Sequence, residues 1–361
     1  MLTRLFNDPE VERLRQAGNR LVCDSGRTLL LPDKLGFCNG VQRALKSVAE
    51  ALSKAKPGRV WIVGEIIHNP TVNRCLQEAG ARIVREEERE SFWDCADCAK
   101  DRVVIPAFGI ERGLELAIRR RFAPELIVDT TCGYVKRSWR LVEQAAADGY
   151  TVAVHGDPRH PEIRSTVSRV GGGRSAVVHL RTPQMARDFV RVLVDGAWRD
   201  WPADGIVNPG QLNRERLALI SQTTLLEDDI REVAEILSEA MVQAGGRLLN
   251  ASASCLATRE RQAAALRLCR RGCDLSLVVG GYGSSNTRQL YRIARSYGAA
   301  FFIGDARNLD SSRITHFIPE TGELRTTSDW LPPSTRRLGI LAGASCPASD
   351  VGDLIRKLGR M

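Results

Sequence analysis

Three cysteines of this chain occupy the same kind of local sequence. Cys38, Cys132 and Cys255 each follow a short apolar stretch and a polar turn, and each precedes apolar residues at helical spacing. A thiol at a helix N-terminus lies at the positive end of the helix dipole, which favours the thiolate that binds metals. One such cysteine is more often a structural thiol. Three equivalent ones can hold an iron–sulfur cluster or a zinc ion.

The sequence contains no fourth cysteine in this context. A cubane cluster held by three thiolates leaves one iron open to a substrate, as a catalytic centre requires. Cys95 and Cys98 form a CxxC motif, but no second pair follows at the spacing of a zinc ribbon, so we interpret this pair as incidental. We therefore predict an iron–sulfur cluster with three cysteine ligands, and zinc binding stays open as the alternative.

Polar side chains that suit an anion follow a second apolar strand in each of the three regions. They are His68, His160 and the turn Ser284-Ser285-Asn286, and each precedes a predicted helix. Free N–H groups of a helix N-terminus, together with hydroxyls and imidazoles, form a site for phosphate or diphosphate. Taken singly, each of these residues is more often a helix cap. Their equivalent positions predict a shared anion site.

A fourth strand in two of the regions ends in a hydroxyl-rich turn, Ser221 to Thr224 and Ala342 to Ser345, whereas the first region has Phe108-Gly109. Glu162, two residues after His160, is the one carboxylate of the whole set. It is therefore the predicted proton donor, if the chemistry needs one. The alternative is that Glu162 only complements the dipole of the helix that it begins.

The elements that position these residues repeat three times along the chain. Each region reads as strands alternating with helices, with a period of roughly 95 to 125 residues, which indicates an internal triplication. Alternating strands and helices predict an α/β protein with mostly parallel sheets, and ligands of such sheets collect beyond the carboxyl ends of the strands. We predict an N-terminal extension over 1–27 and modules over 28–122, 123–245 and 246–361, with the C-terminal segment packing back on the first module.

Size and composition limit the functional class. The 361 residues carry a formal net charge of +9, which suits small anionic ligands or acidic partner proteins. The basic residues form no compact stripe with interleaved aromatics, so we do not expect nucleic-acid binding. No run approaches the roughly 18 apolar residues of a membrane span, and the N-terminus resembles no secretory signal. We expect a cytoplasmic protein without membrane contact, whose ten cysteines stay reduced.

Several of these segments together resemble the LytB/IspH family, the 4-hydroxy-3-methylbut-2-enyl diphosphate reductases. The resemblance covers nearly the whole chain from about residue 28. The segments that carry it are GFCNGVQRA, EIIHNPTV, DTTCGYV, HPEIRST, SQTTL, CLATRERQ, GSSNTRQL and AGAS.

The resemblance implies a trefoil of three pseudo-threefold-related α/β modules around a central [4Fe–4S] cluster, with one iron left open. It implies the reductive dehydroxylation of the diphosphate substrate to isopentenyl and dimethylallyl diphosphate, with an electron donor such as ferredoxin or flavodoxin. It also implies a catalytic role for Glu162 in proton relay and for Thr223 near the leaving oxygen. The remaining implied residues are the ligands Cys38, Cys132 and Cys255 and the substrate-binding His68, His160, Ser284, Ser285, Asn286 and Ser345.

The sequence departs from the family pattern at Phe108, where the family usually has a histidine. An apolar ring there removes one contact to a charged head group and can reshape the pocket for a different substrate. The first alternative is therefore a divergent iron–sulfur enzyme of this type that acts on another substrate, as a reductase of specialised metabolism or a non-redox dehydratase. The second is a non-catalytic or zinc-binding protein that keeps the scaffold.

Overall fold

A computed structural model describes residues 3–171, 173–195, 201–202 and 205–361. By its internal contacts the chain divides into two compact units. Unit 1 consists of Met1–Ile83 and Leu256–Met361, and unit 2 of Val84–Cys255. None of the described helices is both long and apolar enough to cross a membrane.

A seven-stranded sheet forms the centre of unit 1. The inner strands pair in parallel, from β2 through β16 and β12 to β13, while β1, β14 and β15 add antiparallel pairs at the edges. The inner strands are mostly apolar and buried because helices cover both of their faces. In sheet order the strands are β1 (Arg20–Val22), β2 (Thr28–Leu30), β16 (Arg337–Ala342), β12 (Leu275–Val279), β13 (Ala299–Ile303), β14 (Arg313–Ile318) and β15 (Glu323–Ser328).

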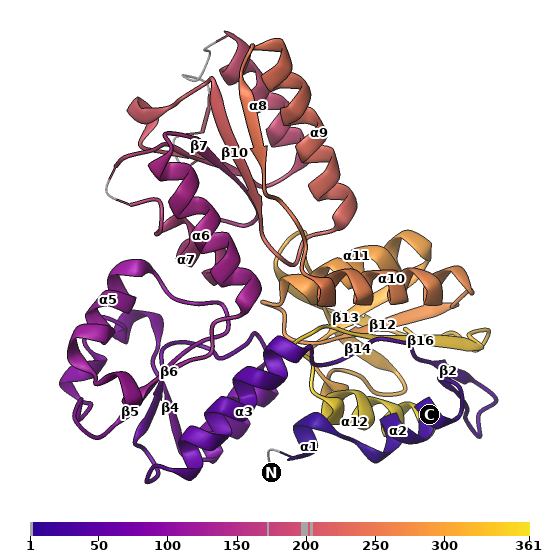
Figure 1. The fold of residues 1–361 in the computed structure, drawn as a ribbon. Coiled ribbons are helices and arrows are strands. Elements are labelled where there is room, and N and C mark those ends of the chain that lie inside the picture. Colours follow the sequence, from indigo (N-terminus) through magenta and orange to yellow (C-terminus); the bar gives the residue numbers. More distant parts are fainter. Residues whose placement is uncertain (1–2, 172, 196–200, 203–204) are drawn as a thin grey trace. The chain divides into compact units, whose positions relative to one another are not determined.

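The helices of unit 1 lie on both faces of this sheet (Figure 1). Helices α10 (Leu256–Arg270) and α11 (Ser285–Tyr297) cover one face, and α1 (Thr3–Phe6), α2 (Pro9–Gln16) and α12 (Ala348–Gly359) cover the other. The second face contains a core in which Leu14 of α2 and Leu354 of α12 pack against Leu277 and Ile340 of the sheet. Unit 1 also contains α3 (Asn39–Ser53), α4 (Pro70–Glu78) and the parallel strands β3 (Val60–Ile62) and β4 (Ala81–Ile83).

Unit 2 contains a second mostly parallel sheet. Alternate residues of its strands face opposite cores: Val152 and Val154 pack with α6 and α7, and Ala153 packs with α8 and α9. In sheet order the strands are β11 (Arg247–Asn250), β10 (Arg216–Ser221), β7 (Thr151–His155), β8 (Val177–Leu180) and the antiparallel β9 (Ile206–Val207). The helices are α6 (Gly133–Ala147), α7 (Pro161–Val167), α8 (Pro183–Asp195) and α9 (Glu227–Gln243).

The rest of unit 2 is a smaller α/β region. The strands β5 (Arg102–Ile105) and β6 (Ile127–Asp129) pair in parallel, with helix α5 (Arg112–Arg121) between them in the chain. Short 3₁₀ helices complete the described elements of the two units: η1 (Glu86–Glu88), η2 (Phe92–Asp94), η3 (Pro124–Leu126), η6 (Pro209–Gln211) and η7 (Ala306–Asn308).

The mixed α/β class with mostly parallel sheets confirms the fold-class prediction. The boundaries of the three predicted modules stay a prediction. Two observations bear on how the chain is organised near its N-terminus. The extension is folded from Thr3 onward and packs on α12, and the strand at 28–30 pairs with β16 of the C-terminal region.

Candidate functional site

Cys38 lies in a tight turn at the N-cap of α3 in unit 1. Its Sγ accepts a hydrogen bond from the Val41 N–H at 3.4 Å, and its own N–H donates to the carbonyl of Ala344 at 3.3 Å. The turn begins at Gly36, whose φ of +73° favours glycine. The half-buried Cys38 is thus held at a helix N-terminus, with its sulfur next to a free N–H group of the helix.

The hydroxyls of unit 1 gather where β12 and β16 end. Ser284 caps α11, its Oγ accepting from the Thr287 N–H at 3.3 Å, and the Ser345 hydroxyl donates to Ser284 Oγ at 3.2 Å. The Ser345 hydroxyl also lies 3.4 Å from the carbonyl oxygen of His68. Ser285 is the first residue of α11 and is half-buried. The structure therefore brings His68, Ser284, Ser285 and Ser345 together within one unit.

Asn286 connects this group to the Cys38 turn. Its side-chain oxygen accepts from the Ala344 N–H at 2.9 Å, and its amide nitrogen donates to Thr258 Oγ1 at 3.4 Å. Ala344 also accepts the hydrogen bond from the Cys38 N–H. The predicted cluster ligand and the predicted anion site of unit 1 thus share one backbone segment.

His68 packs closely against a glycine-rich loop that contains Gly281 and Gly283. The sequence alone did not predict this contact. A Cβ atom on Gly281 would lie 2.1 Å from the His68 carbonyl oxygen, and one on Gly283 would lie 3.4 Å from His68 Nδ1. Only glycine permits so close an approach at Gly281. The Nδ1 atom lies 2.8 Å from a carboxylate oxygen of Glu65, which fixes the ring orientation.

Glu162 and Thr223 form the polar centre of unit 2. One Glu162 oxygen accepts from the Thr223 N–H at 2.7 Å, and the other accepts from the Thr223 hydroxyl at 3.1 Å. Glu162 is only 3% exposed. Burial raises the pKa of the Glu162 carboxyl to about 7, although the two hydrogen bonds from Thr223 act in the opposite direction. The group can therefore hold a proton near neutral pH and release it.

His160 precedes Glu162 as the N-cap of α7. Its Nδ1 accepts from the Glu162 N–H at 3.2 Å, so the ring proton of the neutral imidazole is on Nε2, which can donate to a ligand. The ring of Phe108 meets His160 edge to face, with centroids 5.4 Å apart. The Phe108 turn is itself held by the Ser165 hydroxyl, which donates to the Phe108 carbonyl at 3.0 Å.

The other two cysteines belong to unit 2 and are held in the same way as Cys38. Cys132 is the N-cap of α6, and its N–H donates to the Ala107 carbonyl at 2.9 Å, next to Phe108. The N–H of Cys255 donates to the Thr223 carbonyl at 2.9 Å. Each of the three cysteines is therefore bound through its N–H to a turn that follows a strand of another region of the chain: β16 for Cys38, β5 for Cys132 and β10 for Cys255. This shared link is a structural equivalence of the three positions.

Burial affects six of the other cysteines. It raises the pKa of Cys23, Cys75, Cys98, Cys269, Cys273 and Cys346. A raised pKa disfavours the thiolate that a cluster requires, so these six thiols are poorer candidates for cluster ligands. Cys38, Cys132 and Cys255 are half-buried, as are Cys75, Cys98 and Cys273.

Within the ranges that the structure describes, no three His, Cys, Asp or Glu side chains are gathered as metal ligands. Cys38 lies in unit 1, and Cys132 and Cys255 lie in unit 2.

Two polar residues that the sequence analysis missed support the site of unit 1. Asn69 caps α4 and donates from its amide to buried Asp350 at 3.3 Å, and burial raises the pKa of Asp350 to about 7. An Asn directly before Pro70 was the available sequence signal for this cap.

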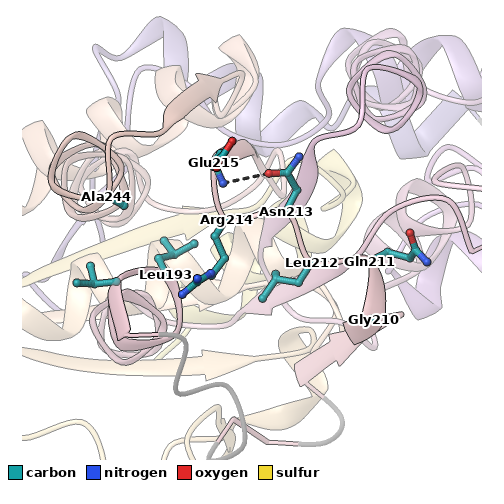
Figure 2. A pocket seen from close by; sticks show the side chains of 9 residues that line it. Leu193, Gly210, Gln211, Leu212, Asn213, Arg214, Glu215 and Ala244 are labelled. Atoms are coloured by element: carbon teal, nitrogen blue, oxygen red, sulfur yellow. Dashed lines mark hydrogen bonds between the residues drawn. The ribbon is translucent and has the colours of Figure 1, made fainter.

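A separate hollow of about 540 Å³ lies in unit 2, near the C-terminal ends of α8 and α9 and the segment before β10. Figure 2 shows Asn213 and Glu215 at this hollow, where the Glu215 N–H donates to the Asn213 side-chain oxygen at 3.0 Å. It lies at the amino end of β10, whereas Thr223 follows the carboxyl end of the same strand. None of the predicted site residues lines it.

Comparison with known proteins decides the family. The family model described as LytB protein matches residues 29–359. The chain belongs to the LytB family. It is 32% identical to a 4-hydroxy-3-methylbut-2-enyl diphosphate reductase of Synechococcus sp., over 99% of this chain and 91% of that protein. A protein of the same name from Nostoc sp. is 31% identical over 92% of this chain and 84% of its own length.

Two solved structures resemble the chain over most of its length. The E-1-hydroxy-2-methyl-but-2-enyl-4-diphosphate reductase from Plasmodium falciparum has a TM-score of 0.69 at 22% identity, covering 91% of this chain and 86% of that one. A second structure, of (E)-4-hydroxy-3-methyl-but-2-enyl diphosphate reductase, has a TM-score of 0.57 at 26% identity, covering 92% and 99%. These likenesses confirm the predicted fold class. As a LytB protein, the chain is an enzyme of an iron–sulfur-dependent oxidoreductase family.

Proposed function

We propose that this chain is a 4-hydroxy-3-methylbut-2-enyl diphosphate reductase. The reaction breaks the allylic carbon–oxygen bond of the substrate, consumes two electrons and two protons, and releases water with isopentenyl or dimethylallyl diphosphate. The observation that carries the proposal is the buried Glu162 carboxyl, bound at both oxygens by Thr223, with a pKa of about 7. An acid with this pKa can deliver a proton at neutral pH and recover it afterwards.

The cluster proposed for this enzyme is a [4Fe–4S] cluster bound by Cys38, Cys132 and Cys255, with one iron left open. Two observations support this ligand set: the three half-buried cysteines share one backbone link, and the pKa of six other thiols is raised by burial. When bound, such a cluster supplies electrons and an open iron at which the substrate can be polarised.

Diphosphate binding is assigned to the donors of both units. In unit 1 these are Ser284, Ser285, Asn286 and Ser345 at the N-terminus of α11, where N–H groups and the helix dipole favour an anion. The Nε2–H of His160 in unit 2 adds a neutral donor. His68 completes the proposed set, with its ring oriented by Glu65.

Proton transfer is assigned to Glu162, with Thr223 as its partner. Thr223 donates to both carboxylate oxygens, so it keeps the carboxyl in one orientation and stabilises the anion that remains after proton release. The Thr223 carbonyl also accepts from the N–H of Cys255. The proton donor and one proposed cluster ligand are thus fixed to a single residue.

The reduction needs an external donor of low-potential electrons. We propose a small acidic electron carrier such as ferredoxin or flavodoxin, which the net charge of +9 would attract. We also propose that the enzyme works in the cytoplasm, where its ten cysteines can stay reduced, three of them as cluster ligands.

One observation favours a second candidate function. Phe108 places an apolar ring against His160. A polar side chain at this position could donate a hydrogen bond to an anion, but a phenyl ring cannot. A related allylic alcohol with a smaller or less charged head group would suit this apolar side chain. The second candidate is therefore an iron–sulfur enzyme of the same type acting on that other substrate, as a reductase or as a dehydratase.

An anaerobic assay of reconstituted protein tests the proposal. The substrate is 4-hydroxy-3-methylbut-2-enyl diphosphate, and turnover is measured with and without a low-potential chemical reductant. We expect turnover only with the reductant. No turnover by protein that carries an intact cluster would reject the proposed substrate and support the second candidate, and turnover without reductant would indicate a dehydratase.

A further inference from the structure

Helix α10 of unit 1 carries a buried cation that the proposed reaction does not use. Arg261 is only 6% exposed. Removing a guanidinium from water is costly unless its N–H groups find acceptors. Arg261 follows the proposed cluster ligand Cys255 by six residues in the sequence. Its contacts show which part of the structure its charge stabilises.

Three hydrogen bonds join Arg261 to two backbone carbonyls. Its Nε and Nη2 both donate to the carbonyl oxygen of Gly36, at 3.0 and 2.7 Å. Its Nη1 donates to the carbonyl of Ala257, one turn earlier in α10, at 2.9 Å. The rigid, planar fork of an arginine suits this arrangement because two of its N–H groups can converge on one acceptor. Lysine has no equivalent geometry.

The Gly36 carbonyl belongs to the turn that presents Cys38. Gly36 adopts a φ of +73°, and a Cβ atom there would lie 3.4 Å from the carbonyl oxygen of Cys346. Two residues later, Cys38 is held by its bonds to Ala344 and Val41. Arg261 therefore fixes the first residue of the turn, Gly36, while the hydrogen bonds to Ala344 and Val41 fix Cys38.

We propose that Arg261 is a positioning residue for the cluster ligand Cys38. It fixes the peptide of Gly36 so that the thiol is presented in one conformation. This inference rests on the proposed function for the identity of the ligand. The contact between Arg261 and the turn is independent of that function.

A neighbouring arginine of the same helix supplies a matched control. Arg267 also lies in α10, but its side chain is 51% exposed and it pairs with Asp33 at 3.3 Å. An exposed pair of this kind contributes little to stability. The variant Arg267→Gln removes a charge from the same helix without touching the turn.

The first measurement compares cluster retention. Wild type, Arg261→Gln, Arg261→Lys and Arg267→Gln are reconstituted anaerobically, and the loss of cluster absorption to an iron chelator is followed. Outer contacts of metal ligands are worth about 10- to 100-fold in metal affinity, so we expect Arg261→Gln to lose its cluster faster by about that factor. Arg261→Lys should fall between, because it keeps the charge but not the fork, and Arg267→Gln should match wild type. Wild-type retention in Arg261→Gln would overturn the proposal.

The second measurement uses the apoproteins, so it does not depend on the cluster. Amide hydrogen exchange is compared between the segment 36–41 around Cys38 and the segment 130–136 around Cys132. In Arg261→Gln we expect faster exchange at 36–41 and unchanged exchange at 130–136. Equal acceleration in both segments would mean general destabilisation and would overturn the inference. A wild type that binds no cluster would reject the proposed cofactor, while the exchange data would still decide whether Arg261 fixes the turn.

Discussion

The residues proposed for function carry different chemistry in the two units. Unit 1 supplies hydroxyl and amide donors, Ser284, Ser345 and Asn286, whose protonation does not change near neutral pH. Unit 2 supplies Glu162, a buried acid with a pKa of about 7. In the proposed function both units supply donors to the anion, and unit 2 also supplies the group that transfers the proton.

The units are alike in how they hold their cysteines. Cys38 in unit 1 and Cys132 and Cys255 in unit 2 each donate their N–H to a turn that carries a site residue or its neighbour. The proposed cluster ligands are therefore common to both units, whereas the hydroxyl donors Ser284 and Ser345 belong to unit 1 and the acid Glu162 to unit 2. Variants of each kind should give distinct phenotypes.

The largest effect is expected for the cysteines, and it should be the same in both units. Cys38→Ser in unit 1 and Cys132→Ser in unit 2 should each abolish cluster binding, because a hydroxyl is a much weaker ligand for iron than a thiolate. Iron and sulfide analysis with absorption spectroscopy after anaerobic purification measures this. Cys95→Ser is the control and should keep a full cluster, since Cys95 is exposed and not at a proposed site. An intact cluster in either of the first two variants would contradict the ligand assignment.

Glu162→Gln should separate proton transfer from binding. The amide keeps the size of the carboxyl but cannot donate a proton as an acid, so kcat should fall by about 10²- to 10⁴-fold. The cluster and the KM should change little, because the anion donors of unit 1 are untouched. Steady-state kinetics with cluster quantification checks the prediction. Near wild-type kcat would remove Glu162 from the mechanism.

The pH dependence should follow from the same carboxyl. Since the protonated form is the donor, kcat should decrease as the pH rises through about 7. The folded-state pKa is raised, so the protonated carboxyl's contribution to the free energy of unfolding is fully present below its unfolded pKa of about 4.5 and lost as the pH rises through about 7. Asp350 of unit 1 has a similarly raised pKa, so denaturant titrations of wild type and Glu162→Gln must be compared. A pH dependence of stability that is unchanged in Glu162→Gln would contradict the attribution to Glu162.

Ser345→Ala should affect binding and spare the chemical step. A hydrogen bond to a charged group contributes about 1.5–3 kcal/mol, so the KM for the diphosphate should rise by about tenfold or more, with a smaller change in kcat. Steady-state kinetics checks this, and Ser53→Ala, at the exposed end of α3 in the same unit, is a matched control. A fall in kcat with unchanged KM would place Ser345 in the chemistry and weaken the division between the units.

Much of this site could be predicted because repeated chemistry is visible in a sequence. The three cysteines and the polar turns at His68, His160 and Ser284 recur at equivalent points, and Glu162 stands beside one of these turns. Parallel strands bring their carboxyl ends to one edge. Long-range contacts leave no such pattern. The fork of Arg261 on Gly36 spans 225 residues of sequence, and the approach of Gly281 to His68 depends on packing between separate loops. The sequence predicted that the C-terminal segment packs back on the first module, but it did not identify β16 as the partner of β2, because a three-residue strand carries too little pattern.

The smallest effect is expected for substitutions of Phe108, the apolar residue that packs against His160 in unit 2. Phe108→His replaces the ring that packs against His160 by one that can donate to an anion. If the natural substrate is the diphosphate, the KM of Phe108→His should fall by up to about tenfold, the worth of about one added hydrogen bond. Phe108→Leu keeps the position apolar and should not show this gain. The opposite result is a KM that rises in Phe108→His and stays near wild type in Phe108→Leu. It would mean that the substrate requires an apolar side chain at position 108, which would favour the second candidate function.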